Sequence, residues 1–344
     1  MDNPIYSRLM RLYVNVERAV MGISNDGDRM VNTLRRQVIG NIAADNINSS
    51  MLNNIGAVNY ANAVNAPIQT FDDNYIGEFA EDIAQLSEME RELFVGQLNS
   101  YFEGSPIVDD VALDNILSSP SVDLAPEVNN STDVLGNLIT GIMSSAALGG
   151  SHTNTDIINT VGRARSSATP LSRYSNALGR TLRDSARSAV NQVRLGIISS
   201  NENAIEAIQH VSVLDNRTSD ICKARAGLTW ENNEDRTPIG HTLPFIVPPV
   251  HVGCRSTIVP VFRDADDLES RGLIPDSALR SFLGESAEGI DFDSFLESLS
   301  AAERRDILGA GRYELYRQGA ITSMELVNMS GRPLTLTELR DRYR

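Results

Sequence analysis

The segment from Val211 to Val261 constrains the fold more than any other part of the chain. It contains both cysteines of the protein, Cys222 and Cys254, and two of its 4 histidines, His241 and His251. Thiol and imidazole side chains are the usual ligands of transition metals and the usual groups of nucleophilic sites. A chain that uses them so sparingly elsewhere is therefore expected to build one site here.

Two thiolates and two imidazoles suit a tetrahedral zinc ion, and the His251-x2-Cys254 pair can chelate a metal from a single turn. With Cys222 and His241 as the other ligands, all four positions are filled by protein, so the predicted site is structural. Asp215 is a substitute for His241, which lies in a turn-like stretch. The alternative is that Cys222 is a small buried apolar residue and His251 a hydrogen-bonded core histidine.

The same residues also permit an enzymatic interpretation. Asp215, His251 and Cys254 have the residue types of a Cys–His–Asp nucleophile set. His251 is also a candidate active-site residue of a metal-dependent nuclease. Neither arrangement is accompanied in the sequence by an evident oxyanion-binding loop or an acidic metal cluster. We therefore expect the chain not to be an enzyme, and keep a DNA-processing or thiol enzyme that uses His251 and Cys254 as the alternative.

The residues that flank the first cysteine indicate a turn that leads into a helix. Asp215, Thr218 and Ser219 are typical of such turns, because their side-chain oxygens accept hydrogen bonds from free backbone amides. Arg217 and Arg255 can each form a forked pair with a carboxylate, and Asp215 is the candidate partner.

Charge is distributed unevenly along the chain. The net charge is -15, which argues against a general nucleic-acid binder. Residues 1–150 hold 20 acidic residues against 7 arginines, a net of -13, whereas residues 160–200 are arginine-rich. This helical stretch either contacts DNA or an acidic partner, or serves solubility and pairs with the acidic part of the chain. Its candidate contact residues are Arg173, Arg180, Arg183, Arg187 and Arg194.

The sequence excludes several other classes of protein. Its first twenty residues have no apolar run of the kind found in secretory signals, and no stretch is apolar enough to cross a bilayer. Lys223 is the single lysine, so no phosphate-binding Gly-Lys-Ser/Thr motif exists. We expect synthesis in a reducing cytoplasm, where a disulfide is the less favoured use of the two cysteines.

Apolar periodicity predicts an α+β fold that is predominantly helical. Short alternating segments at 210–215, 228–230 and 256–262 predict a small antiparallel sheet around the Cys/His cluster. Helical patterns precede and follow this sheet. The predicted regions are an acidic helical region, a Pro-containing linker and loop region, a domain that carries the cluster, and a helical tail: 1–104, 105–153, 154–262 and 263–344.

The order and spacing of residues around the cluster resemble the phage Mu F-like head morphogenesis domain. The matching positions are Leu214-Asp215-x-Arg217-Thr218-Ser219-x-x-Cys222, Gly227, and Pro248-Pro249-x-His251-x-x-Cys254-Arg255-Ser256-Thr257. The resemblance covers residues 181–262. The stretch from Leu308-Gly309 through Arg312 to Leu339 is similar to the tail that often follows this domain.

This resemblance implies a minor structural protein of a tailed-phage head. Such proteins lie inside the capsid in several copies, are often associated with the portal, and can contact the major capsid protein or the packaged DNA. The protein is then expected in the virion after synthesis in the bacterial host cytoplasm, with roles in head assembly and in genome packaging or ejection, and with no membrane partner. The domain is sometimes fused to injected toxins, but residues 263–344 carry no catalytic pattern that favours this.

Overall fold

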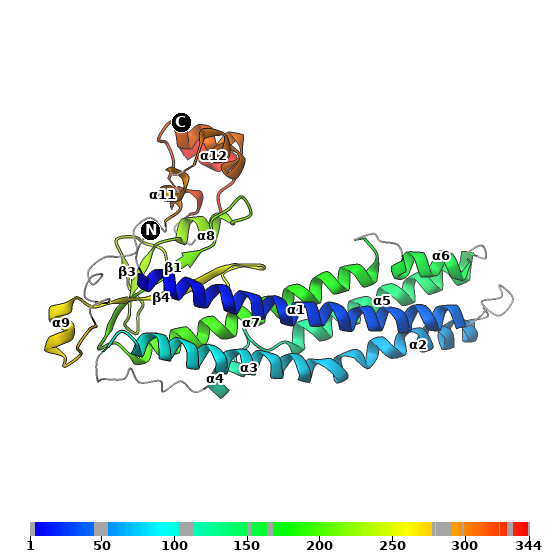
Figure 1. Cartoon of the computed structure of the whole chain (residues 1–344). Helices are drawn as coiled ribbons and strands as arrows, with labels where there is room; N and C mark the ends of the chain where they lie inside the picture. Colours follow the sequence, from blue (N-terminus) through cyan, green and yellow to red (C-terminus); the bar gives the residue numbers. More distant parts are fainter. Residues whose placement is uncertain are drawn as a thin grey trace. The chain divides into compact units, whose positions relative to one another are not determined.

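A computed structural model describes residues 4–44, 54–102, 113–149, 153–163, 168–276, 279, 291–297, 299–322, 324–328 and 333–342. The fold is α+β and predominantly helical, with one small antiparallel sheet, as the sequence predicts (Figure 1). The chain divides into two compact units. Unit 1 comprises Met1–Val16, Ser87–Ile116 and Arg187–Arg344, and unit 2 comprises Glu17–Leu86 and Leu117–Ala186.

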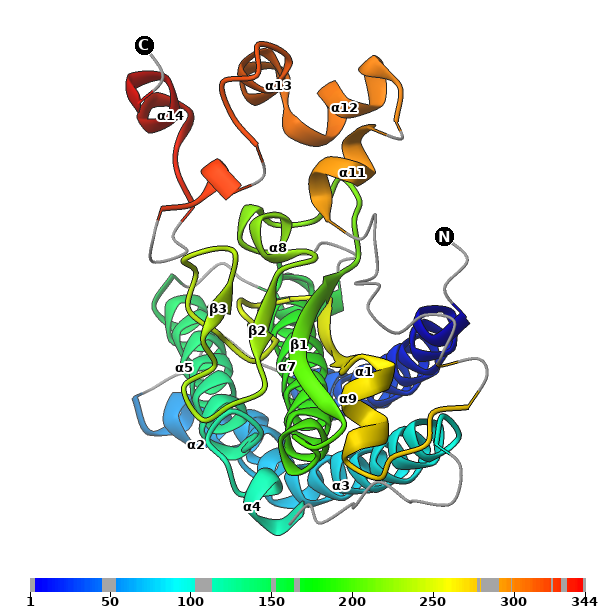
Figure 2. The same ribbon diagram turned by 90° about the vertical axis from the view of Figure 1, so that its left-hand side faces the viewer.

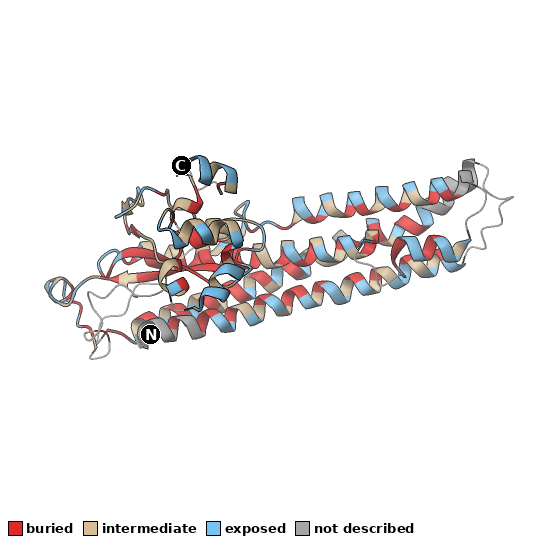
Figure 3. Cartoon of the chain, turned by 90° about the horizontal axis from the view of Figure 1, so that it is seen from above, coloured by how far each residue is buried: buried red, intermediate tan, exposed pale blue. Residues whose placement is uncertain are grey.

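Unit 2 is built mainly from long helices whose described residues bury apolar stripes. Its elements are all or part of α1 (Pro4–Ala44), α2 (Asn54–Gln69), α3 (Phe71–Asn99), α5 (Ala125–Gly149), α6 (Asn154–Ile158), the π-helical η1 (Asn159–Arg163) and α7 (Pro170–Ser200). Buried and exposed positions alternate along these helices at helical spacing (Figure 3). No described helix is long and apolar enough to span a membrane.

The region expected to be linker and loop, 105–153, contains two helices among its described residues, α4 (Leu113–Leu117) and α5 (Ala125–Gly149). Pro126, which suggested a loop, occupies the first turn of α5. Proline is tolerated there because the first turn needs no intrahelical amide donor. Helix α5 buries Val128, Leu135 and Ile139, so it is part of a packed core and not a connector.

Unit 1 is centred on a four-stranded antiparallel sheet in the order β3-β2-β1-β4. Figure 2 shows β3, β2 and β1 side by side. The strands are β1 (Ile205–Ser212), β2 (Thr229–Glu231), β3 (Pro238–Ile239) and β4 (Ser256–Phe262). The last of these coincides with the predicted segment. Strand β1 lies earlier than predicted and ends at Ser212, because Asp215 and Thr218 form the turn that follows it.

The largest apolar cluster of unit 1 joins the sheet to the end of α7, the start of α1 and the end of α3. It includes Leu9, Leu12, Phe94, Leu98, Tyr101, Val193, Ile197, Ile205, Ile208, Val211, Ile258, Val259 and Phe262. A strand pair alone is only marginally stable in water. Packing against these helices therefore makes the sheet a rigid platform for the residues at its edge.

The remaining elements of unit 1 are short helices. They are α8 (Asp220–Arg225), α9 (Ala265–Ser270), α11 (Phe292–Glu297), α12 (Ala301–Leu308), α13 (Ala310–Arg317), the 3-10 turn η2 (Met324–Leu326) and α14 (Leu336–Arg342). We refer to the described residues from Asp291 to Arg342 as the C-terminal region. Most of its buried apolar residues form one cluster, to which Ala226 also belongs, whereas Val327 packs with Ala224, Trp230 and Leu243.

Candidate metal centre

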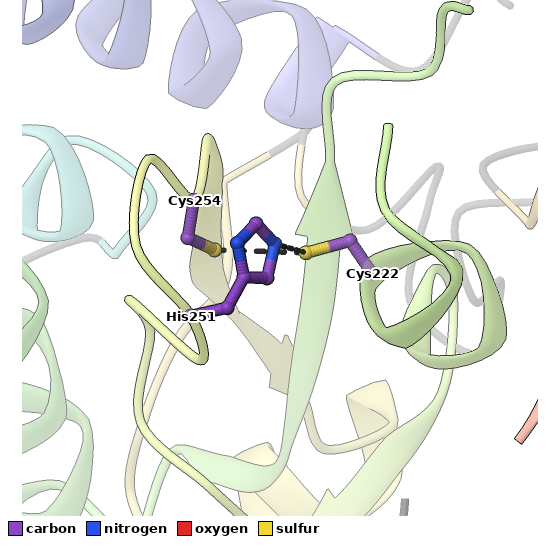
Figure 4. Close-up of side chains that lie close together, drawn as sticks. All are labelled: Cys222, His251 and Cys254. Carbon is purple, nitrogen blue, oxygen red and sulfur yellow. Dashed lines mark hydrogen bonds between the residues drawn. The ribbon is translucent and has the colours of Figure 1, made fainter. Parts of the chain in front are cut away.

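The structure brings Cys222, His251 and Cys254 together (Figure 4). Cys222 belongs to α8, whereas His251 and Cys254 lie in the loop that precedes β4. The Cys222 Sγ atom is 3.1 Å from His251 Nε2 and 3.6 Å from Cys254 Sγ. All three donor atoms lie within 4.8 Å of one another, so this group can hold a metal ion.

Cys222 is positioned by the beginning of α8. The side chain of Ser219 caps this helix by accepting a hydrogen bond from the Cys222 amide at 3.3 Å. The carbonyl of Cys222 accepts a hydrogen bond from the Ser212 hydroxyl at the end of β1. One residue therefore takes its position from both the helix cap and the sheet.

His251 and Cys254 are placed by a tight turn. The Cys254 amide donates to the His251 carbonyl at 3.1 Å, and Gly253, the third residue of this turn, has a φ of 73°. Type II turns need a positive φ at this position, which glycine adopts without strain. Tyr13 from α1 donates a hydrogen bond to the Arg255 carbonyl at 2.9 Å and holds the end of the turn.

A two-pronged ion pair ties the two halves of the site together. Arg255 Nη1 and Nη2 lie 2.9 and 2.7 Å from the two carboxylate oxygens of Asp215. Hydrogen bonding from Arg255 lowers the pKa of Asp215 to about 2, so the carboxylate is charged at neutral pH. The hydroxyl of Thr218 donates to the Val213 carbonyl at 2.7 Å and closes the turn. Arg217 is largely exposed and contributes its amide to Asp215.

The pKa values of the two thiols are shifted in opposite directions. A hydrogen bond from Cys254 lowers the pKa of Cys222 to about 6, and the Ser219 and Ser256 hydroxyls act in the same direction. The same hydrogen bond, with burial, raises the pKa of Cys254. A thiolate at Cys222 is the form that binds metals, and a metal would supply the charge needed to ionise Cys254.

His251 is held in the tautomer that metal binding requires. Its Nδ1 lies 2.9 Å from the Val252 carbonyl and donates to it, which leaves Nε2 as an acceptor, 2.6 Å from the Ser219 hydroxyl and 3.1 Å from Cys222 Sγ. Around a tetrahedral zinc ion two sulfurs would be about 3.8 Å apart, and a sulfur and a nitrogen about 3.6 Å. The separation of the two sulfurs, 3.6 Å, is close to the first value, whereas Cys222 Sγ and His251 Nε2, 3.1 Å apart, would have to separate by about 0.5 Å to admit the ion.

The structure does not bring His241 into this group. Its Nε2 donates to the Thr229 carbonyl at 2.8 Å and its Nδ1 accepts from the Leu243 amide at 3.2 Å. Both nitrogens are therefore engaged, and the ring packs edge-on against Trp230. Asp215, the substitute fourth ligand, is committed to Arg255. The fourth coordination position is thus supplied by neither candidate.

The five arginines predicted to contact DNA or a partner do not share one exposed face. Arg173 and Arg180 are exposed. Arg183 is half-buried and donates to Ser24 at 2.6 Å. Arg187 and Arg194 are buried, 6% and 1% exposed, so neither is available to a partner in this structure. Arg194 instead forms a buried ion pair with Glu90 at 2.5 Å.

Several residues near the thiols were not singled out as site residues from the sequence. The Ser256 hydroxyl donates to Cys222 Sγ at 3.2 Å and lies 2.9 Å from the Ser212 hydroxyl. His210 is fully buried, and neither ring nitrogen has a hydrogen-bond partner among the described residues. His210 and Ser212 alternate along β1 and therefore share a face of the sheet, a signal that the sequence does contain.

Comparisons of the chain with protein-family models, with curated proteins and with solved structures found no match.

Proposed function

We propose that this chain is a minor structural protein of a tailed-phage head, located inside the capsid at or near the portal. The observation that supports it is the convergence of the motif residues that resemble the Mu F-like domain. Asp215 and Arg255 form a forked pair, and Cys222, His251 and Cys254 form a donor group beside it. The motif therefore describes one built site, even though its two halves are far apart in sequence.

We propose further that Cys222, His251 and Cys254 hold a structural zinc ion. Sulfur and imidazole donors at these separations favour zinc over calcium or magnesium, which prefer oxygen. The ion would tie α8 to the loop that precedes β4, a loop with little regular structure of its own. Cys222 and Cys254 are 3% and 0% exposed, which suits a structural ion better than one that meets a substrate.

Quantitative mass spectrometry of purified particles, with portal pull-down from the same lysate, tests the head-protein proposal. We expect a few to a few tens of copies in each particle, co-purifying with the portal protein. Absence from particles, with the protein free in the infected cell, would overturn the proposal. Major capsid protein and packaged DNA are further candidate partners, and cross-linking in intact particles tests both.

A thiol enzyme is the second candidate, favoured by the 3.1 Å approach of Cys222 Sγ to His251 Nε2. The sequence pointed to Cys254 as the nucleophile, but Cys254 is fully buried and its pKa is raised. Cys222 is the better candidate in this structure. Replacing Cys222 with serine distinguishes the two functions. Loss of bound zinc and lower thermal stability support the structural site. A folded and equally stable variant without activity supports catalysis.

A further inference from the structure

Helix α8 (Asp220–Arg225) contacts the candidate metal centre and the C-terminal region at the same time. Cys222 contributes its sulfur to the metal centre. Asp220, two residues before it, and Lys223, the residue after it, face residues of the C-terminal region. A helix of six residues is far too short to be stable alone, so its position depends on these two sets of contacts.

The polar contacts of α8 with the C-terminal region are specific. Asp220 Oδ2 is 2.8 Å from Arg312 Nη2, and the same guanidinium nitrogen donates to the Leu334 carbonyl at 3.1 Å. The Nζ atom of Lys223 lies 5.2 Å from the centroid of the Phe292 ring and 3.4 Å from Asp220 Oδ1. These contacts involve α11, α13 and the segment that precedes α14, so they fix more than one element.

Apolar packing and backbone shape complete the contact. Ala226 belongs to the apolar cluster of the C-terminal region, which contains Phe292, Leu296, Leu308, Ile321, Leu326, Leu334 and Leu339. Gly227 has a φ of 82°, and a methyl group at this position would lie 3.0 Å from Asp291 Cβ and 3.2 Å from its Cα. A side chain at position 227 would therefore press on Asp291 and would also strain the backbone, which has a positive φ here.

We propose that α8 couples metal binding to the docking of the C-terminal region. The inference rests on the proposed zinc site. A bound ion would hold Cys222 to His251 and Cys254 and so fix α8 in the orientation that presents Asp220 and Lys223. Without the ion, α8 keeps its ion pair with Arg312 and the packing of Ala224 against Val327. It loses the link from Cys222 to the loop that precedes β4, so the C-terminal region docks on a less rigid surface.

Hydrogen exchange of the full chain, measured by mass spectrometry with zinc and after chelation, tests this coupling. On chelation we expect faster exchange in α12, α13 and α14, and unchanged exchange in α5 of unit 2. Zinc content measured on the same samples separates the two proposals. A chain that binds no zinc overturns both, whereas a chain that binds zinc but shows no change in these helices overturns only the coupling.

Reciprocity supplies a second test with a matched control. If metal binding favours docking, loss of docking must weaken metal binding by the same factor, typically about 5- to 150-fold. Arg312→Met removes the pair with Asp220, so its zinc affinity, measured by chelator competition, is expected to fall by a factor in this range. Arg317→Met is the control, because Arg317 pairs with Glu314 on the exposed surface of its own helix. Equal affinities for wild type, Arg312→Met and Gly227→Ala would overturn the coupling.

Discussion

At the scale of single residues, His210 shows how the site depends on pH. Burial lowers the pKa of His210 to about 4 from the ordinary value of 6.5, so the folded chain keeps this ring neutral. The unfolded chain takes up a proton below pH 6.5, which means that stability is complete above that value and falls as pH drops towards 4. Protonation of His210 at acidic pH therefore lowers the stability of the sheet beside the candidate metal centre.

We expect this histidine to account for about 2 kcal/mol of the stability lost between pH 7.5 and pH 5. The measurement is urea unfolding in the presence of a chelator, followed by the fluorescence of Trp230, the single tryptophan, which is buried in unit 1. His210→Leu should lose that part of the pH dependence. An unchanged difference between the two pH values in the variant would show that His210 is not the titrating group.

At the scale of elements, α3, α7 and β4 meet at a buried ion pair. Arg194 on α7 contacts Glu90 on α3 at 2.5 Å and the Thr257 hydroxyl on β4 at 2.6 Å. Burial raises the pKa of Glu90, while the contact with Arg194 opposes this effect. The pair links three elements, and removing one partner leaves the other buried without its counter-charge.

The two halves of this pair are not equivalent. Glu90→Leu leaves an arginine that cannot lose its charge, and we expect it to cost about 3–5 kcal/mol of unfolding free energy. Arg194→Met should cost less, because Glu90 can take up a proton. The double variant Glu90→Leu/Arg194→Met should be more stable than Glu90→Leu alone in urea unfolding followed by Trp230. Additive costs would mean that the two side chains do not interact.

Sequence patterns predicted a strand from local alternation and a side-chain group from the scarcity of cysteine and histidine elsewhere in the chain. Strand β4 was placed correctly by its alternation, and Cys222, His251 and Cys254 by their chemistry and spacing. The surroundings of two other candidate residues, His241 and Arg194, depend on contacts that only the folded chain makes. His241 forms hydrogen bonds with backbone groups of Thr229 and Leu243. Arg194 pairs with Glu90, which lies 104 positions away. Neither partner follows from periodicity or spacing.

At the scale of the whole molecule, an ion bound at the proposed zinc site would add to the stability of unit 1. A ligand that binds only the folded state at 100 times its Kd contributes about 2.7 kcal/mol, which corresponds to roughly 5–10 °C in melting temperature for a unit of this size. We expect zinc to raise the melting temperature of the wild type by this amount, and Cys254→Ser to abolish the gain. His241→Gln, whose side chain lies outside the donor group, should keep it. A gain that persists in Cys254→Ser would place the metal elsewhere.

The charge of the molecule limits what it can do with DNA. With a net charge of -15, any contact with phosphate must come from local basic residues, and of the five candidates on α7 only Arg173 and Arg180 are exposed. Each phosphate contact contributes about 0.9 to the slope of log affinity against log salt concentration. If α7 binds duplex DNA, replacing both arginines with alanine should therefore reduce that slope by about 2 in fluorescence anisotropy titrations. Arg194→Met serves as the control, because a buried arginine releases no counterions. An equal slope in all three proteins would assign any DNA affinity to another surface, and the basic stretch would then serve the packing and solubility of its own helix.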